Sequence, residues 1–282
     1  MNVIKTLAAA AIGLGGLFGG QVSAEQTPAV IDAPVPLLQA ARIDQLMQIV
    51  ATEGARHGLG LEASLFPGRG GPAWELIVSH IQSPERMTKR LGQVLKSELS
   101  DDDAAAVAAY LSKGAGARIV AREVDTRLEM LDGAVEAEAK RVSTELRDAN
   151  PEQAALIDAL LNSLDLLGAN VSGGLNANFA FYKGLDDGGA LTGGLGEGEM
   201  LAMVWAQEES VRSATEEWLH GYLTRAYAPL AEDDLRDYLA FSATRAGKRY
   251  FAAMFAGFGA VFEETSYDLG LAAARFMTQD DA

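Results

Sequence analysis

Cysteine is absent from this chain of 282 residues, and histidine and tryptophan occur only three times each. Without cysteine there is no disulfide, no thiol nucleophile and no lipid-modified cysteine. The sequence also lacks the Gly-x-Ser-x-Gly elbow of serine hydrolases and the Gly-Lys-Ser/Thr loop that binds phosphates. The stability of the fold must therefore come from packing alone, and three common kinds of catalytic site are excluded.

Basic residues are outnumbered, with 23 Lys and Arg against 39 Asp and Glu, which gives a net charge of −16. This charge opposes binding to nucleic acids and to anionic lipid surfaces. We therefore expect no nucleic-acid partner. A simpler role of the charge is to keep the protein soluble.

Long apolar runs are confined to the first residues of the chain. After Lys5 no charge occurs up to Ala24, and the run closes on Val22-Ser23-Ala24. This pattern predicts a secretory signal peptide, residues 1–24, cleaved near Ala24, followed by a linker over 25–35. The alternative is a membrane anchor, but the run is short and rich in glycine. We expect a periplasmic protein without stable membrane insertion after cleavage.

Apolar residues recur with helical spacing in the rest of the chain. Between Arg118 and Leu146 they are three, four or seven apart, which predicts one long helix with a buried face. Phe251, Phe255, Phe258 and Phe262 predict a second long helix. No stretch alternates with period two for long enough to indicate a sheet. The expected fold class is all-α.

Three short motifs predict helix starts. Ser83-Pro84-Glu85, Ser100 before an acidic triplet, and Asn150-Pro151 each combine a capping residue with a proline or acids in the first turn. Such residues satisfy the free N–H groups of a helix and complement its dipole.

The chain also resembles itself. Residues 39–46 match residues 153–160 at six of eight positions, an offset of 114. Farther along, the offset is 131 and pairs Trp74 with Trp205 and Gly116 with Gly247. We expect both tryptophans to be at least half buried, because tryptophan stabilises a fold mainly through the area it buries. We predict two homologous helical units in tandem, over 36–148 and 150–277, with a tail over 278–282. The change of offset predicts a 17-residue insertion in the second unit, within a Gly-rich loop over 184–199.

Candidate catalytic groups are few. Glu216 and His220 are one helical turn apart, but a helical zinc motif requires a second histidine, so a surface pair is the simpler interpretation. The acidic triplets 101–103 and 232–234 fit helix capping better than a cation site. Asp186 and Glu197 have the spacing of a calcium loop without its intermediate ligands. We predict no metal and no cofactor.

Aromatic residues are uneven, because 16 of the 20 follow residue 150. If one unit contains a cavity, we expect it in the second. Phe179, Phe181 and Tyr182 precede the Gly-rich loop, and we predict that a ligand or partner surface involves these three residues with the loop over them. The alternative is that the aromatics are core and the loop is a spacer.

One motif resembles a known family. Residues 230–249 are similar to the closing motif of the exported bacterial family called domain of unknown function 2059 (DUF2059). Phe241, Thr244, Gly247 and Arg249 fall on the motif's positions, whereas Ser242 and Arg245 replace an aromatic residue and a proline. The first unit fits less closely. The resemblance implies an exported all-helical domain and gives no catalytic residues.

Together these observations predict a non-catalytic interaction or ligand-binding module of the cell envelope. The partner would be an unidentified protein or a small apolar ligand, and a homo-oligomer remains open. The alternative function is an exported hydrolase that uses the Glu216 carboxylate with His220.

Overall fold

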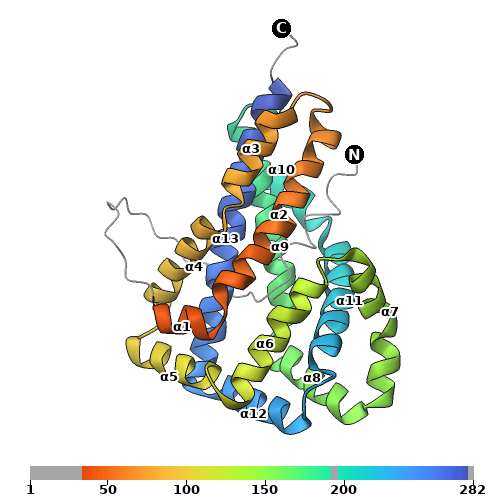
Figure 1. Ribbon diagram of the computed structural model, residues 1–282. Coiled ribbons are helices and arrows are strands. Elements are labelled where there is room, and N and C mark those ends of the chain that lie inside the picture. Colours follow the sequence, from red (N-terminus) through yellow and green to blue (C-terminus); the bar gives the residue numbers. More distant parts are fainter. Residues whose placement is uncertain (1–33, 192–195, 279–282) are drawn as a thin grey trace.

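The computed structural model describes residues 34–191 and 196–278. Within these ranges the chain is helical and contains no β-strand, so the expected all-α class is confirmed (Figure 1). The predicted signal peptide, most of the linker and most of the tail lie outside the described residues.

Seven helices form the N-terminal half of the molecule. They are α1 (Val35–Ala40), α2 (Ile43–Leu65), α3 (Gly71–Ile81), α4 (Pro84–Glu98), α5 (Asp101–Leu111), α6 (Gly114–Glu129) and α7 (Gly133–Ala149).

Six further helices follow the junction at Asn150. They are α8 (Pro151–Ser163), α9 (Leu166–Asp187), α10 (Glu197–Trp205), α11 (Glu208–Tyr227), α12 (Glu232–Ala243) and α13 (Arg245–Thr278).

The three predicted helix starts are confirmed. The Ser83 hydroxyl accepts a hydrogen bond from the backbone N–H of Arg86 at the start of α4, and Ser100 does the same for Asp103 in α5. Asn150 caps α8 by accepting from the backbone N–H of Gln153. Capping side chains replace the partners that the first N–H groups of a helix lack.

The prediction of one helix from Arg118 to Leu146 was wrong. Helix α6 ends at Glu129, and α7 begins at Gly133 after Asp132, whose side chain accepts from the backbone N–H of Ala134. The Asp132-Gly133 pair therefore starts a new helix inside an otherwise continuous apolar pattern. By contrast, α13 is a single helix, and Phe251, Phe255 and Phe258 are buried in the core.

Two buried clusters form the interior. The larger cluster lies in the broad end of the molecule and includes residues from α1, α2, α4–α9 and α11–α13. The smaller one lies in the narrow end, where α3 and α10 flank the last turns of α13 (Figure 1). Each cluster mixes residues from before and after Asn150, so the two halves share both cores.

Helices α9 and α13 pack together closely because both carry glycine at the contact. A Cβ atom at Gly184 would collide with the carbonyl oxygen of Tyr267, and one at Gly270 would collide with that of Phe181. The missing side chains let the two backbones approach.

The predicted alignment of the two halves was wrong over their first helices. Residues 39–46 span the break between α1 and α2, whereas residues 153–160 lie inside α8. Trp74 is buried near the start of α3, but Trp205 ends α10 and is 64% exposed. These residues do not occupy equivalent positions, and the expected burial of Trp205 was wrong.

The predicted insertion was also placed incorrectly. Residues 184–187 belong to α9 and residues 197–199 to α10, so much of the expected loop is helical. The segment between these helices, over 188–196, is described in part.

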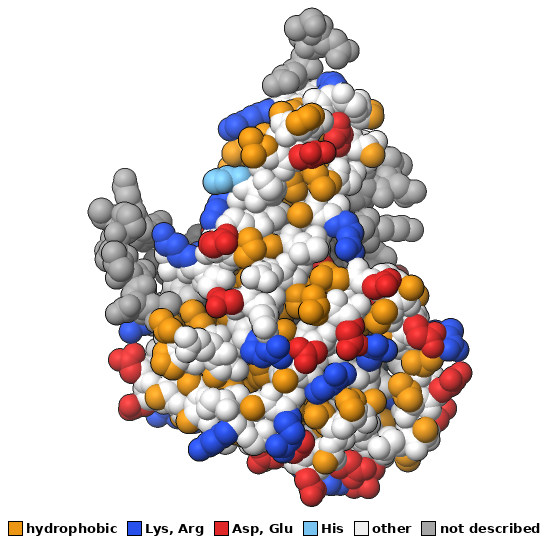
Figure 2. Space-filling view, in the orientation of Figure 1, with side chains coloured by type: hydrophobic (Ala, Val, Ile, Leu, Met, Phe, Trp, Pro, Cys, Tyr) orange, Lys and Arg blue, Asp and Glu red, His pale blue; other side chains and the backbone are white. Residues whose placement is uncertain are grey.

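None of the single helices described is long and apolar enough to cross a membrane. The bent pair α8–α9 passes the same test by length and composition, with a bend of 49°. The face shown in Figure 2 carries acidic and basic side chains interspersed with apolar ones.

Candidate ligand cavity around Glu123

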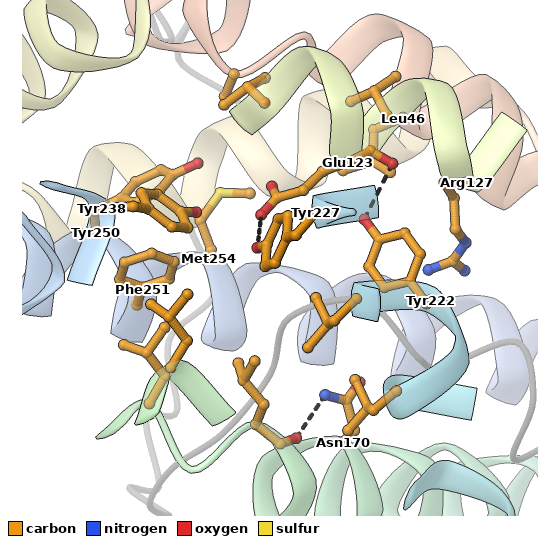
Figure 3. Close-up of a pocket in the computed structure, with 18 of the residues that line it drawn as sticks. Leu46, Glu123, Arg127, Asn170, Tyr222, Tyr227, Tyr238, Tyr250, Phe251 and Met254 are labelled. Atoms are coloured by element: carbon orange, nitrogen blue, oxygen red, sulfur yellow. Dashed lines mark hydrogen bonds between the residues drawn. The ribbon is translucent and has the colours of Figure 1, made fainter. Parts of the chain in front are cut away.

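A partly open cavity lies between helices of the two halves, and most of its lining comes from α6, α11 and α13 (Figure 3). Its volume is about 70 Å³. A single water needs roughly 10–15 Å³, so the space can hold several waters or a compact ligand. The lining is mainly aliphatic and aromatic. It consists of Ala41, Leu46, Val120, Glu123, Val124, Arg127, Leu160, Leu164, Leu166, Asn170, Trp218, Leu219, Tyr222, Leu223, Tyr227, Tyr238, Tyr250, Phe251 and Met254.

Glu123 supplies the carboxyl group of this cavity. It lies on α6, one turn from Val120 and next to Val124, so the buried face of the helix carries the acid inward. The hydroxyl of Tyr227 donates to Glu123 Oε1 at 2.5 Å, and that of Tyr222 donates to the Glu123 carbonyl oxygen at 3.1 Å. Figure 3 shows both bonds.

Burial changes the acidity of Glu123. Although the residue keeps partial exposure, its carboxyl group is enclosed, and this desolvation raises its pKa from 4.5 to about 7. Hydrogen bonding from Tyr227 and Tyr238 lowers the pKa and offsets part of the effect. Among the described residues, no lysine or arginine forms an ion pair with Glu123. The carboxyl group is therefore close to half protonated at neutral pH.

Four tyrosines surround the acid. Tyr222 and Tyr227 lie on α11, Tyr238 on α12 and Tyr250 on α13. Burial, followed by the nearby charge of Glu123, raises the pKa of each hydroxyl well above its usual value. All four stay protonated at neutral pH and can donate hydrogen bonds.

Arg127 brings a positive charge to the cavity wall, and Glu53 compensates it. The guanidinium donates to both Glu53 carboxylate oxygens, at 3.1 and 2.6 Å. The same guanidinium lies 4.8 Å from the ring centroid of Trp218, a cation–π contact. Because Glu53 neutralises Arg127, the cavity retains one carboxyl group without a counter-charge.

The predicted surface residues lie elsewhere. Phe181 and Tyr182 are buried in the smaller core cluster, with 3% and 9% of their surface exposed. Phe179 is partly buried and lines a separate open groove that also contains Lys183 and Glu263. The structure thus does not bring the three aromatic residues onto one surface. The burial of two of them fits the alternative that they are core.

The histidines and acidic triplets form no reactive cluster. Glu216 is exposed, His220 is partly buried, and no hydrogen bond joins them in the described part of the chain. Neither residue lines the Glu123 cavity. Over residues 34–191 and 196–278, no group of three or more His, Asp or Glu side chains is placed to hold a metal ion.

No protein family, curated protein sequence or solved structure matches this chain. The case for a function therefore depends on the cavity.

Sequence reasoning missed Glu123 and the tyrosines. The uneven distribution of aromatics did favour a cavity in the second half, which supplies all four tyrosines. However, Glu123 and Arg127 come from the first half. The only sequence signal for Glu123 is an acid directly beside the buried face of α6. An acid at such an edge usually points to solvent.

Proposed function

We propose that this protein is an exported, non-catalytic binding module that takes a compact and largely apolar ligand into the Glu123 cavity. The observation that carries the proposal is a partly open, mostly apolar cavity with a few convergent polar groups, the usual composition of a small-molecule site. Periplasmic location and membership of the DUF2059 family form part of the same proposal. They are supported by the pattern of residues 1–24 and by the motif over 230–249.

We further propose that the two halves, 36–148 and 150–277, arose by duplication. The order of helices supports this. The six helices α1–α6 correspond one by one to α8–α13, and α7 is an additional helix between the two sets. Arg42 precedes α2 with φ of 52°, and Asp165 precedes α9 with φ of 46°. A left-handed residue other than glycine is uncommon, so its recurrence at the same place supports a common origin.

Reciprocal contacts between the halves support a twofold relation. Arg118 donates to Asp234 at 2.8 Å, and Arg249 lies 3.8 Å from Asp103. Each residue of the second pair is 131 positions from its counterpart in the first. Such an exchange of partners is characteristic of an isologous interface.

Other pairs of residues that are 131 positions apart also lie close together. The rings of Tyr110 and Phe241 stack with centroids 3.8 Å apart. Val120 and Phe251, and likewise Glu123 and Met254, are 131 positions apart and line the same cavity. The proposed site is thus made by both units together.

A cavity-filling substitution tests the binding function. We expect some members of a panel of compact amines, alcohols and aromatic compounds to raise the melting temperature of the purified protein. A ligand present at 100 times its Kd would raise the free energy of unfolding by about 2.7 kcal/mol. Ala41→Leu fills part of the cavity and should abolish the rise.

The matched control is Ala272→Leu, which enlarges a buried alanine in the smaller core cluster, away from the cavity. Each rise is measured relative to the same variant without ligand, since overpacking lowers stability by about 1–3 kcal/mol. If no compound stabilises the wild type, or if Ala41→Leu responds as fully as Ala272→Leu, the proposed function is wrong.

A further inference from the structure

We propose that the ligand of the Glu123 cavity is a compact organic cation, an alkylated ammonium group held between aromatic rings and the Glu123 carboxylate. This inference rests on the proposed function, because both require the cavity to admit a ligand. It adds the charge and the chemical class of that ligand.

Aromatic side chains form a large part of the cavity wall. Trp218, Tyr222, Tyr227, Tyr238, Tyr250 and Phe251 all line the space. The faces of such rings are electron-rich and attract cations, most strongly when water is excluded. Arg127 already makes this contact on Trp218, whose ring in turn stacks on Tyr222 with centroids 4.7 Å apart. One ring of the wall therefore already binds a positive charge, that of the Arg127 guanidinium.

Within the ranges that the structure describes, the charged groups around the cavity leave one carboxylate without a partner of opposite charge. Arg127 faces the cavity from α6, and the bidentate contact with Glu53 neutralises it. Asn170 faces it from α9 as a neutral group whose amide donates to the Leu166 carbonyl oxygen at 2.7 Å. Glu123 is the remaining carboxyl, and a buried carboxylate without a counter-ion is costly. A bound cation removes that cost.

The side chains that line the cavity suit an organic cation better than a metal ion. Metal ions such as calcium require six or more oxygen ligands, often from several carboxylates. The lining of this cavity has a single carboxyl among aromatic and aliphatic side chains. An alkylated ammonium needs few hydrogen-bond acceptors and gains from apolar contact, as this lining provides. The net charge of −16 also attracts cations to the molecule.

A pair of probes of the same shape tests the inference by calorimetry. We expect tetramethylammonium to bind the wild-type protein at least tenfold more tightly than tert-butanol, its neutral counterpart. Glu123→Gln keeps the size and polarity of the side chain and removes the charge. It should weaken tetramethylammonium binding at least tenfold while leaving tert-butanol binding unchanged.

The matched control is Glu263→Gln. Glu263 is a solvent-exposed residue of α13 in the separate groove, and desolvation of its carboxyl group raises its pKa as well. This variant should bind both probes like the wild type. Equal binding of the two probes, or tetramethylammonium binding unaffected by Glu123→Gln, would overturn the cation inference and leave the cavity function standing. If neither probe binds, the cation inference is also overturned, and the panel with Ala41→Leu decides the proposed function separately.

Discussion

Glu123 is held inside the protein by its place on α6, between Val120 and Val124. Those two valines belong to the larger core cluster, so the helix cannot rotate to bring the acid to solvent without exposing them. The tyrosine hydroxyls satisfy part of the hydrogen-bonding capacity of the carboxyl, and none of them supplies a positive charge. An acid in this position lowers the stability of the folded protein whenever it is ionised.

The pH dependence of stability follows from this. In the folded protein the Glu123 pKa is about 7, against 4.5 for the unfolded chain, so the folded state binds more protons between these values. The free energy of unfolding should therefore fall as the pH rises from 4.5 to 7, by roughly 3 kcal/mol from this residue.

Glu123→Gln should remove this contribution. Its unfolding free energy in urea, compared with that of the wild type at several pH values, should show a flatter dependence between pH 4.5 and 7 and a higher stability at pH 8. Parallel wild-type and Glu123→Gln curves would show that the Glu123 carboxyl is solvated.

At the scale of helices, the contact between α9 and α13 depends on two glycines rather than on large side chains. Gly270→Ala places a methyl group against the backbone of α9 and should lower the free energy of unfolding by about 1–3 kcal/mol. Gly259 is on the same helix, and a Cβ atom there meets nothing within 4 Å.

Gly259→Ala is the matched control. It should raise the free energy of unfolding by about 0.5–1 kcal/mol, because alanine restricts the unfolded chain and favours the helix. Denaturation in urea measures both variants. If the two alanines change stability by the same amount, α9 and α13 are not in backbone contact.

Several helices could be predicted from local sequence because their ends are determined by nearby residues. Ser83, Ser100 and Asn150 act within three residues of the groups they cap, so the sequence pattern is sufficient. The break between α6 and α7 was missed, since the apolar spacing continues across it. Asp132-Gly133 was the available signal.

The register of the halves could not be obtained from short identities. Trp74 was matched to Trp205, but in the structure Trp74 and Val78 are buried four residues apart on α3, as Met200 and Val204 are on α10. The two helices thus share the spacing of their buried residues but not the residue types. Residues 39–46 and 153–160 are similar in sequence, but the first segment spans a break between two helices and the second lies inside one helix. A short pattern of alanine and leucine does not show where helices end.

At the scale of the whole molecule, the two halves form one structure with shared cores. The cavity illustrates why its residues were not predictable, since Glu123 meets Tyr227 only because α6 of one half packs on α11 of the other. Nothing in the sequence near either residue specifies that contact. The acidic triplets likewise act across the halves, through Asp103 with Arg249 and Asp234 with Arg118.

The most direct test of the account observes the cavity itself. Met254 lines it, whereas Met200 is buried in the smaller core cluster. In protein labelled with carbon-13 at the methionine methyl groups, titration with tetramethylammonium should shift the Met254 signal in a saturable way and leave the Met200 signal in place. A Met254 signal that does not move, or one that moves no more than that of Met200, would contradict a cation site around Glu123.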